Sequence, residues 1–198
     1  MPRKFPQLAF TPAVKAIQEQ RGSRAGYARF EQSGPANDSV TPDIAAFIAS
    51  MDGFYLGTVN AHGYPYIQFR GGYPGFLKVL DDKTLGFADF RGNVQYISVG
   101  NLSENDKAFL FLMDYRHRRR LKILGRARSV EGDRLLIEQL RVPEDDSEIE
   151  RVILFDIEAW DWNCPQHIPI QYSEQEVANL QARIAELENR LSQYTGQG

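Results

Sequence analysis

The chain has 198 residues, a formal net charge of −3 and an apolar content of 42%. This length suits one domain with a short appendage, and the mild charge gives no reason to expect nucleic acid or a membrane surface as a partner. The single cysteine, Cys164, excludes a disulfide within the chain and a zinc site built from several cysteines. No apolar run approaches the roughly 18 residues of a membrane-spanning helix, and residues 1–10 lack a secretory signal, so we expect a cytoplasmic protein.

Helix signals dominate the first quarter of the chain. Residues 1–10 are expected to form an extended arm, and residues 25–32 a short helix. Thr11-Pro12 and Thr41-Pro42 each join a hydroxyl N-cap to a proline at the first helical position, which predicts helices from residues 12 and 42. In the later helix, the apolar residues 44, 47, 48 and 51 lie on one face, and Gly53 is expected to close it.

Strand patterns follow, separated by turn sequences at residues 60–63, 81–83 and 131–133. Short helices are expected over residues 93–101 and 134–140, and the run 107–115 reads as a strand covered on both faces. The order of elements has no β-α-β rhythm, which disfavours a dinucleotide-binding α/β domain. A sheet of about seven antiparallel strands avoids exposed edge strands best by closing into a barrel. The predicted strands cover residues 54–59, 64–70, 76–80, 84–90, 107–115, 121–131 and 152–161.

The C-terminal segment from residue 172 has a different pattern. Five apolar residues repeat with alternating spacings of three and four, which is a heptad seam, and Arg183 and Glu188 flank it at g and e positions. The seam is only about two and a half heptads long, which is short for an independent coiled coil. It therefore either pairs across a dimer or packs on its own domain. Its members are Val177, Leu180, Ile184, Leu187 and Leu191.

An anion site is indicated between residues 64 and 101. Asn93 is a good N-cap for the helix expected after it, Gly92 allows close approach of the backbone, and Arg91 could add a charge-assisted contact. An ordinary strand-to-helix turn with an exposed arginine explains the same residues equally well. Arg70 beside Gly71 is a second candidate, for which a plain loop is the simpler reading.

Several other side chains allow more than one interpretation. Lys78 and Asp89 lie on neighbouring predicted strands, where they are expected to pair with each other unless they contact a cofactor ring. Cys164 and His167 supply too few ligands for a zinc site, so Cys164 is expected to be a buried structural thiol. Trp160 and Trp162 lie two residues apart and share a face, which suits core packing and a cofactor or dimer contact equally.

Four blocks of the sequence, in this order and spacing, resemble the FMN-binding split-barrel family. More narrowly, they are similar to the flavin-nucleotide-binding proteins related to pyridoxamine 5′-phosphate oxidase. The resemblance covers about residues 40–170. The blocks are FYLGTVNAHGYPYIQFRGG, GFLKVLDDKTLGFADFRGNVQYISVGNLSENDKAFLFLMDY, RRRLKILGRAR and WNCPQHI.

This resemblance implies an α+β fold that is mainly β, an antiparallel Greek-key split barrel with peripheral helices. It also implies a homodimer with FMN at the subunit interface. The expected organisation is an arm with short helices over residues 1–40, the barrel over 41–171 and the heptad helix over 172–198. By position, the implied cofactor-binding residues are Arg70, Gly71, Phe76, Leu77, Lys78, Asp89, Phe90, Arg91, Gly92, Asn93, Gln95, Arg120, Trp162, Gln166 and His167.

The segment from Trp162 to Ile168 departs from the oxidase pattern, because it lacks the arginine and histidine arrangement that grips pyridoxal phosphate in that enzyme. The resemblance therefore implies an FMN-dependent oxidoreductase with an altered, unknown small-molecule substrate. The alternatives are a non-enzymatic flavin binder or carrier, a split barrel that binds haem or a deazaflavin, and a structural dimer with a degenerate site. No catalytic side chain is assigned, because a flavin carries the redox chemistry itself.

Overall fold

The computed structural model describes residues 2–195, which divide into two compact units. Of the described residues, the larger unit contains 2–113 and 120–164, and the smaller contains 114–119 and 165–195. The larger unit begins with three helices, α1 (Lys4–Ala9), α2 (Pro12–Gln20) and α3 (Arg24–Gln32). The prediction of an extended arm over residues 1–10 was wrong. Pro6 lies in the first turn of α1, where its missing N–H costs no hydrogen bond, and Phe5 and Pro6 are buried.

The two helices with a Thr-Pro start form where the sequence predicted them. In α2 the Thr11 hydroxyl accepts a hydrogen bond from the Val14 N–H at 3.3 Å. Helix α4 (Pro42–Ala49) buries Ile44, Phe47 and Ile48, as its periodicity indicated. Gly53 does not close α4, because the helix ends at Ala49 and Gly53 opens the first strand.

Seven strands form one sheet in the order β2-β1-β5-β6-β7-β4-β3. The register given for the pairs β1–β2, β1–β5, β3–β4, β4–β7 and β6–β7 is antiparallel throughout. All seven predicted strands are present, although β3 is much shorter than expected. The strands are β1 (Gly53–Val59), β2 (Pro65–Gly71), β3 (Lys78–Val79), β4 (Thr84–Phe90), β5 (Lys107–Asp114), β6 (Arg119–Val130) and β7 (Ile149–Trp162).

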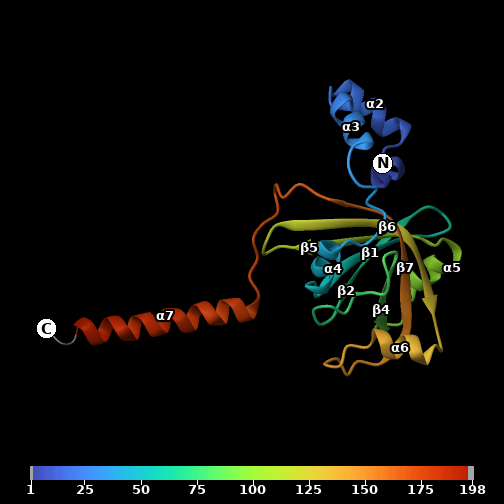
Figure 1. Ribbon diagram of the computed structural model, residues 1–198. Coiled ribbons are helices and arrows are strands. Elements are labelled where there is room, and N and C mark those ends of the chain that lie inside the picture. The colour runs from blue at the N-terminus through green and yellow to red at the C-terminus, as the bar shows by residue number, and fades with distance from the viewer. Residues whose placement is uncertain (1, 196–198) are drawn as a thin grey trace. The chain divides into compact units, whose positions relative to one another are not determined.

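The sheet curls back on itself, as expected for a barrel (Figure 1). Arg70 on β2 forms an ion pair with Asp89 on β4, although these strands lie near opposite ends of the sheet order. The concave side holds one main core, to which β1, β4, β5, β6, β7 and α4 contribute. Phe54, Phe87 and Phe155 are among its largest fully buried side chains. These features confirm the α+β class and the split-barrel fold.

Two further helices complete the larger unit, α5 (Ile97–Glu104) and α6 (Arg134–Leu140). Asp133 caps α6 by accepting a hydrogen bond from the Leu136 N–H at 3.0 Å. Helix α5 begins four residues later than predicted, because Tyr96 adopts a left-handed conformation that a right-handed helix cannot contain. Asn93 is therefore not its N-cap; the Asn93 side chain instead accepts a hydrogen bond from the Gln95 N–H at 3.3 Å.

One face of the barrel wall is apolar and open. Tyr55 on β1 stands opposite Phe69 on β2 and Phe111 on β5, and Gly57 stands opposite Ile67 and Phe109. Ile67 is 66% exposed and Phe69 is 58% exposed. The prediction that residues 107–115 are covered on both faces was wrong for the single chain, since the outward side chains of β5 are only half-buried.

The smaller unit contains helix α7 (Glu174–Thr195). A reciprocal capping box begins this helix: the Glu176 N–H donates to the Ser173 hydroxyl at 3.2 Å, and the Ser173 N–H donates to the Glu176 carboxylate at 2.9 Å. Within the same unit, Arg116 donates to Glu176 at 2.9 Å. Among residues 2–195, no helix combines the length and the apolar character needed to cross a membrane.

Candidate functional site

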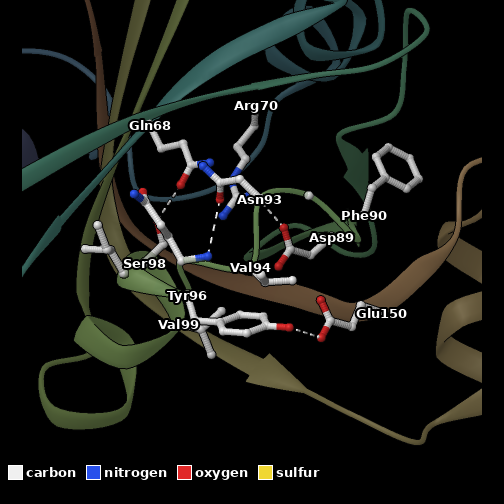
Figure 2. Close-up of a pocket in the computed structure, with 13 residues that line it drawn as sticks. Gln68, Arg70, Asp89, Phe90, Asn93, Val94, Tyr96, Ser98, Val99 and Glu150 are labelled. Atoms are coloured by element: carbon white, nitrogen blue, oxygen red, sulfur yellow. Dashed lines mark hydrogen bonds and ion pairs between the residues drawn. The ribbon is translucent and has the colours of Figure 1, made fainter.

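A cavity of about 260 Å³ lies between β2, the end of β4 and the start of α5 (Figure 2). The β2 side chains reach it through strand alternation, which directs Gln68 and Arg70 to the same side of the strand. The chain then returns to the cavity at the loop after β4 and along the first turn of α5. The lining residues are Gln68, Arg70, Asp89, Phe90, Gly92, Asn93, Val94, Gln95, Tyr96, Ile97, Ser98, Val99 and Glu150.

Arg70 and Asp89 form the charged centre of this cavity. Figure 2 shows the two side chains pointing toward each other, and Nη1 of Arg70 lies 2.5 Å from Oδ1 of Asp89. Burial raises the pKa of Asp89, while the positive charges of Arg70 and Arg151 oppose that shift. The Nε of Arg70 is buried and has no hydrogen-bond partner among the described residues. The guanidinium has five N–H donors, of which the ion pair with Asp89 uses one, so the same side chain can also serve an anionic ligand.

The loop between β4 and α5 has a strained backbone. Val94 and Tyr96 both have φ of 54°, a conformation that is costly for a residue with a β-carbon and especially for β-branched Val94. Such outliers concentrate at ligand sites. Here they turn the chain so that Ile97, Ser98 and Val99, the first three residues of α5, line the cavity. The N–H groups of a first helical turn lack intrahelical partners and attract anions.

A second charged group closes the other side of the cavity. The Tyr96 hydroxyl donates to Glu150 at 2.8 Å, as Figure 2 shows, and this bond raises the pKa of Tyr96. Glu150 is itself paired with Arg151 at 2.5 Å, and the Arg151 guanidinium lies 4.9 Å from the centre of the Tyr96 ring. Both acidic residues of the cavity are thus balanced by an arginine, which leaves the α5 N-terminus as its unbalanced electropositive element.

The structure brings six of the predicted cofactor residues to this cavity: Arg70, Asp89, Phe90, Gly92, Asn93 and Gln95. Two more, Gly71 and Phe76, line a smaller cavity of about 140 Å³. Arg70, Asp89 and Phe90 line both cavities, which are therefore adjacent. Four of the eight residues that line the smaller cavity are phenylalanines, namely Phe69, Phe76, Phe87 and Phe90.

Three predicted residues lie elsewhere in the larger unit. Leu77 is 1% exposed and belongs to the core. Lys78 does not pair with Asp89 as expected, because it stands opposite Gly86 and its ammonium group donates to the carbonyls of Gln139 and Arg141. Arg91 is not among the lining residues; its side chain is 60% exposed and lies 3.4 Å from Glu148.

The remaining predicted residues come late in the chain. Arg120 donates to the Cys164 carbonyl at 2.8 Å, and its Nε is buried without a partner among the described residues. Trp162 packs edge-on against Phe47 and lines a separate cavity of about 550 Å³ beside the N-terminal helices. Cys164 is exposed, so the expectation of a buried thiol was wrong. Gln166 and His167 belong to the smaller unit.

Sequence reasoning missed several lining residues. Gln68 was detectable, because it lies two residues before Arg70 on the same strand and therefore shares its face. Glu150 was not detectable locally, since it reaches the cavity only through the pairing of β4 with β7. The positions of Tyr96 and Ser98 depend on the left-handed backbone of residue 96, and the sequence has no glycine at that position to indicate it.

The fold and the cavity together define a split-barrel protein with a site suited to an anionic group at the start of α5. The comparison with known families agrees with this class. A family model described as pyridoxamine 5′-phosphate oxidase matches residues 40–161. The chain therefore belongs to the pyridoxamine 5′-phosphate oxidase family. No curated protein matches the sequence.

Solved structures with the same fold are distant in sequence. HupZ from Group A Streptococcus aligns with a TM-score of 0.51 and 16% identity, over 67% of this chain and 99% of HupZ. An FMN-binding protein from Syntrophomonas wolfei aligns with a TM-score of 0.49 and 13% identity, over 75% of this chain and 97% of that protein. At this identity, the likeness to HupZ shows only that the fold is shared and carries no information about the ligand.

Proposed function

We propose that the protein binds FMN and acts as an FMN-dependent oxidoreductase whose substrate differs from pyridoxamine phosphate. The observation that carries the proposal is the position of the Arg70 guanidinium in the same cavity as the N-terminus of α5. Membership of the pyridoxamine 5′-phosphate oxidase family supports FMN as the anionic ligand.

The residues present suit an FMN phosphate. In the proposal, the first-turn N–H groups of α5 and the Arg70 guanidinium hold the phosphate, and the open Gly92 allows close approach of the loop. Asp89 holds Arg70 in position, and its raised pKa lowers the cost of sharing that arginine with an anion. Phe90, which lines both cavities, would flank the ring end, and the buried Phe76 would support it from the core side. When bound, the flavin supplies hydride or electron transfer, so the chain needs only to bind, orient and shield it.

The proposal includes a homodimer. The outward face formed by Tyr55, Ile67, Phe69, Phe109 and Phe111 is a contiguous apolar surface, which monomeric proteins rarely leave open. Burial of this face by a second copy would also explain why β5 is apolar on both sides. On the resemblance alone, Leu77, Lys78, Arg91, Arg120, Trp162, Gln166 and His167 remain proposed cofactor residues.

The test is an FMN titration of the purified protein stripped of ligand, followed by flavin fluorescence. Arg70→Ala is expected to weaken FMN binding by about 10- to 100-fold, because a hydrogen bond to a charged group contributes roughly 1.5–3 kcal/mol. Arg29→Ala is the matched control, since Arg29 is an exposed arginine on α3 that does not line the cavity.

Unchanged FMN affinity in Arg70→Ala would contradict the proposed phosphate site. Tight FMN binding without reduction of the flavin by NADH or NADPH would favour the flavin carrier over the oxidoreductase. A chromophore other than flavin in the purified protein would point to a haem or deazaflavin ligand.

A further inference from the structure

We propose that α7 forms a parallel, in-register, two-stranded coiled coil with α7 of a second copy of this chain. The heptad positions assign Val177, Ile184 and Leu191 to a, and Leu180, Leu187 and Tyr194 to d. All six side chains are between 41% and 77% exposed in the single chain. The other positions of the helix are polar or alanine, so this row is the surface by which α7 would pack against a partner.

The shape of the apolar row selects a coiled-coil partner rather than a globular surface. A helix that packs on a protein core usually carries apolar residues at a, d and also e or g, which gives a broad stripe. In α7 the e and g positions are polar: Gln181 and Glu188 occupy e, and Arg183 and Arg190 occupy g. The stripe is therefore the narrow a/d seam that interlocks with a second helix of the same kind.

The residue types at the seam specify two parallel strands. The first two a positions hold β-branched Val177 and Ile184, and the first two d positions hold Leu180 and Leu187. This combination packs well in parallel dimers, whereas isoleucine at d shifts the preference to larger assemblies. In such a dimer each seam residue lies beside its own counterpart from the other chain.

The flanking charges favour the parallel orientation over the antiparallel one. In a parallel coil a g residue faces the e residue five positions later in the partner, so each Arg183 meets a Glu188 and forms two equivalent ion pairs. In an antiparallel coil, the register that pairs all six seam residues places each Arg183 opposite Arg190 of the other chain. That arrangement gives two repulsive pairs of arginines. Arg183 already donates to Glu186 at 2.5 Å within its own helix, and its fork of five N–H donors can serve both carboxylates.

The start of the helix is fixed by the residues that precede the seam. The capping box between Ser173 and Glu176, together with the contact from Arg116 to Glu176, sets the first turn directly before Val177. The seam is only about two and a half heptads long, so its association is expected to depend on a high local concentration of the two helices. The barrel homodimer proposed above would supply that concentration.

The test is disulfide trapping in the full-length chain with the native thiol removed by Cys164→Ala. In that background, Leu180→Cys places a thiol at a d position, where a parallel in-register coil brings it against its own counterpart. Ala182→Cys places a thiol at the outward f position as the matched control. With oxidised glutathione, covalent dimer is expected to form at least about fivefold faster for Leu180→Cys than for Ala182→Cys.

The orientation and the charges are tested in the same assay. Arg183→Glu is expected to slow trapping at residue 180 about two- to fivefold, and Arg183→Glu combined with Glu188→Arg is expected to restore it. Equal trapping at residues 180 and 182, or none at either, would overturn the coiled coil and favour packing of α7 on its own barrel. Trapping of Leu180→Cys with Leu191→Cys protein, without trapping of either alone, would show an antiparallel coil.

Discussion

At the scale of single residues, the Arg70–Asp89 pair decides how the cavity responds to pH. Burial raises the pKa of Asp89, so this carboxyl group accepts a proton at a higher pH than an exposed aspartate. Relative to the unfolded chain, folding therefore shifts Asp89 toward its protonated form, so the free energy of unfolding falls as the pH rises and Asp89 ionises. Only the ionised form competes with an anionic ligand for the Arg70 guanidinium.

The affinity for FMN is accordingly expected to increase as the pH falls through the raised pKa of Asp89. Asp89→Asn removes the competing charge at every pH, so this variant should bind FMN about fivefold more tightly at pH 7, roughly 1 kcal/mol, and depend less on pH. The FMN phosphate itself titrates near pH 6 in both proteins, so the ratio of the two dissociation constants isolates Asp89. An equal loss of affinity at every pH would instead mean that Asp89 mainly positions Arg70.

Some residues of the site are placed by the local sequence, and others by contacts between strands that are distant in the chain. Arg70, Gly92 and Asn93 were predictable because they stand at the ends of strands with a clear pattern. The role of Asn93 was not predictable. An N-cap prediction assumes that the helix starts next to Asn93, but the left-handed Tyr96 delays the start of α5. Glu150 could not be found locally, because its position depends on the register of β4 against β7.

At the scale of elements, the β6–β7 ladder depends on one glycine at a register shift. A β-carbon on Gly125 would lie 2.1 Å from the Asp156 carbonyl oxygen and 2.5 Å from the Phe155 ring. Backbone atoms and a fully buried ring cannot move aside easily, so the ladder would have to separate. Hairpins and Thr-Pro helices were readable from the sequence, but a close approach of this kind appears only when two strands meet.

Gly125→Ala is expected to lower the free energy of unfolding by about 1–3 kcal/mol, the usual cost of overfilling a packed core. Gly26→Ala is the control: a β-carbon at this position of α3 meets nothing within 4 Å, and the change should stabilise the helix by about 0.5–1 kcal/mol. Urea unfolding followed by circular dichroism measures both. A neutral Gly125→Ala would show that the ladder adjusts without cost.

At the scale of the whole molecule, the open face of β2, β1 and β5 is expected to hold the barrel homodimer together. Ile67→Lys places a charge on this face at a side chain that is 66% exposed, so it should leave the single chain folded. We expect the dissociation constant of the dimer to rise at least about tenfold in sedimentation equilibrium, because a buried unpaired charge costs several kcal/mol.

Leu135→Lys is the matched control, since Leu135 is an 85% exposed apolar residue on α6, outside this face. A dimer of unchanged stability in Ile67→Lys would place the interface on another surface. If Ile67→Lys also lowers the affinity for FMN while Leu135→Lys does not, this result would support a cofactor site completed by the second subunit.

The central claim is that the cavity at the start of α5 holds FMN. The most direct test is the absorption spectrum of the purified protein, followed by mass spectrometry of the compound released on denaturation. We predict the absorption spectrum of a flavin, on the order of one FMN per chain, and a released mass equal to that of FMN. A colourless protein that takes up no added FMN, or one that releases haem or a deazaflavin, would contradict the account.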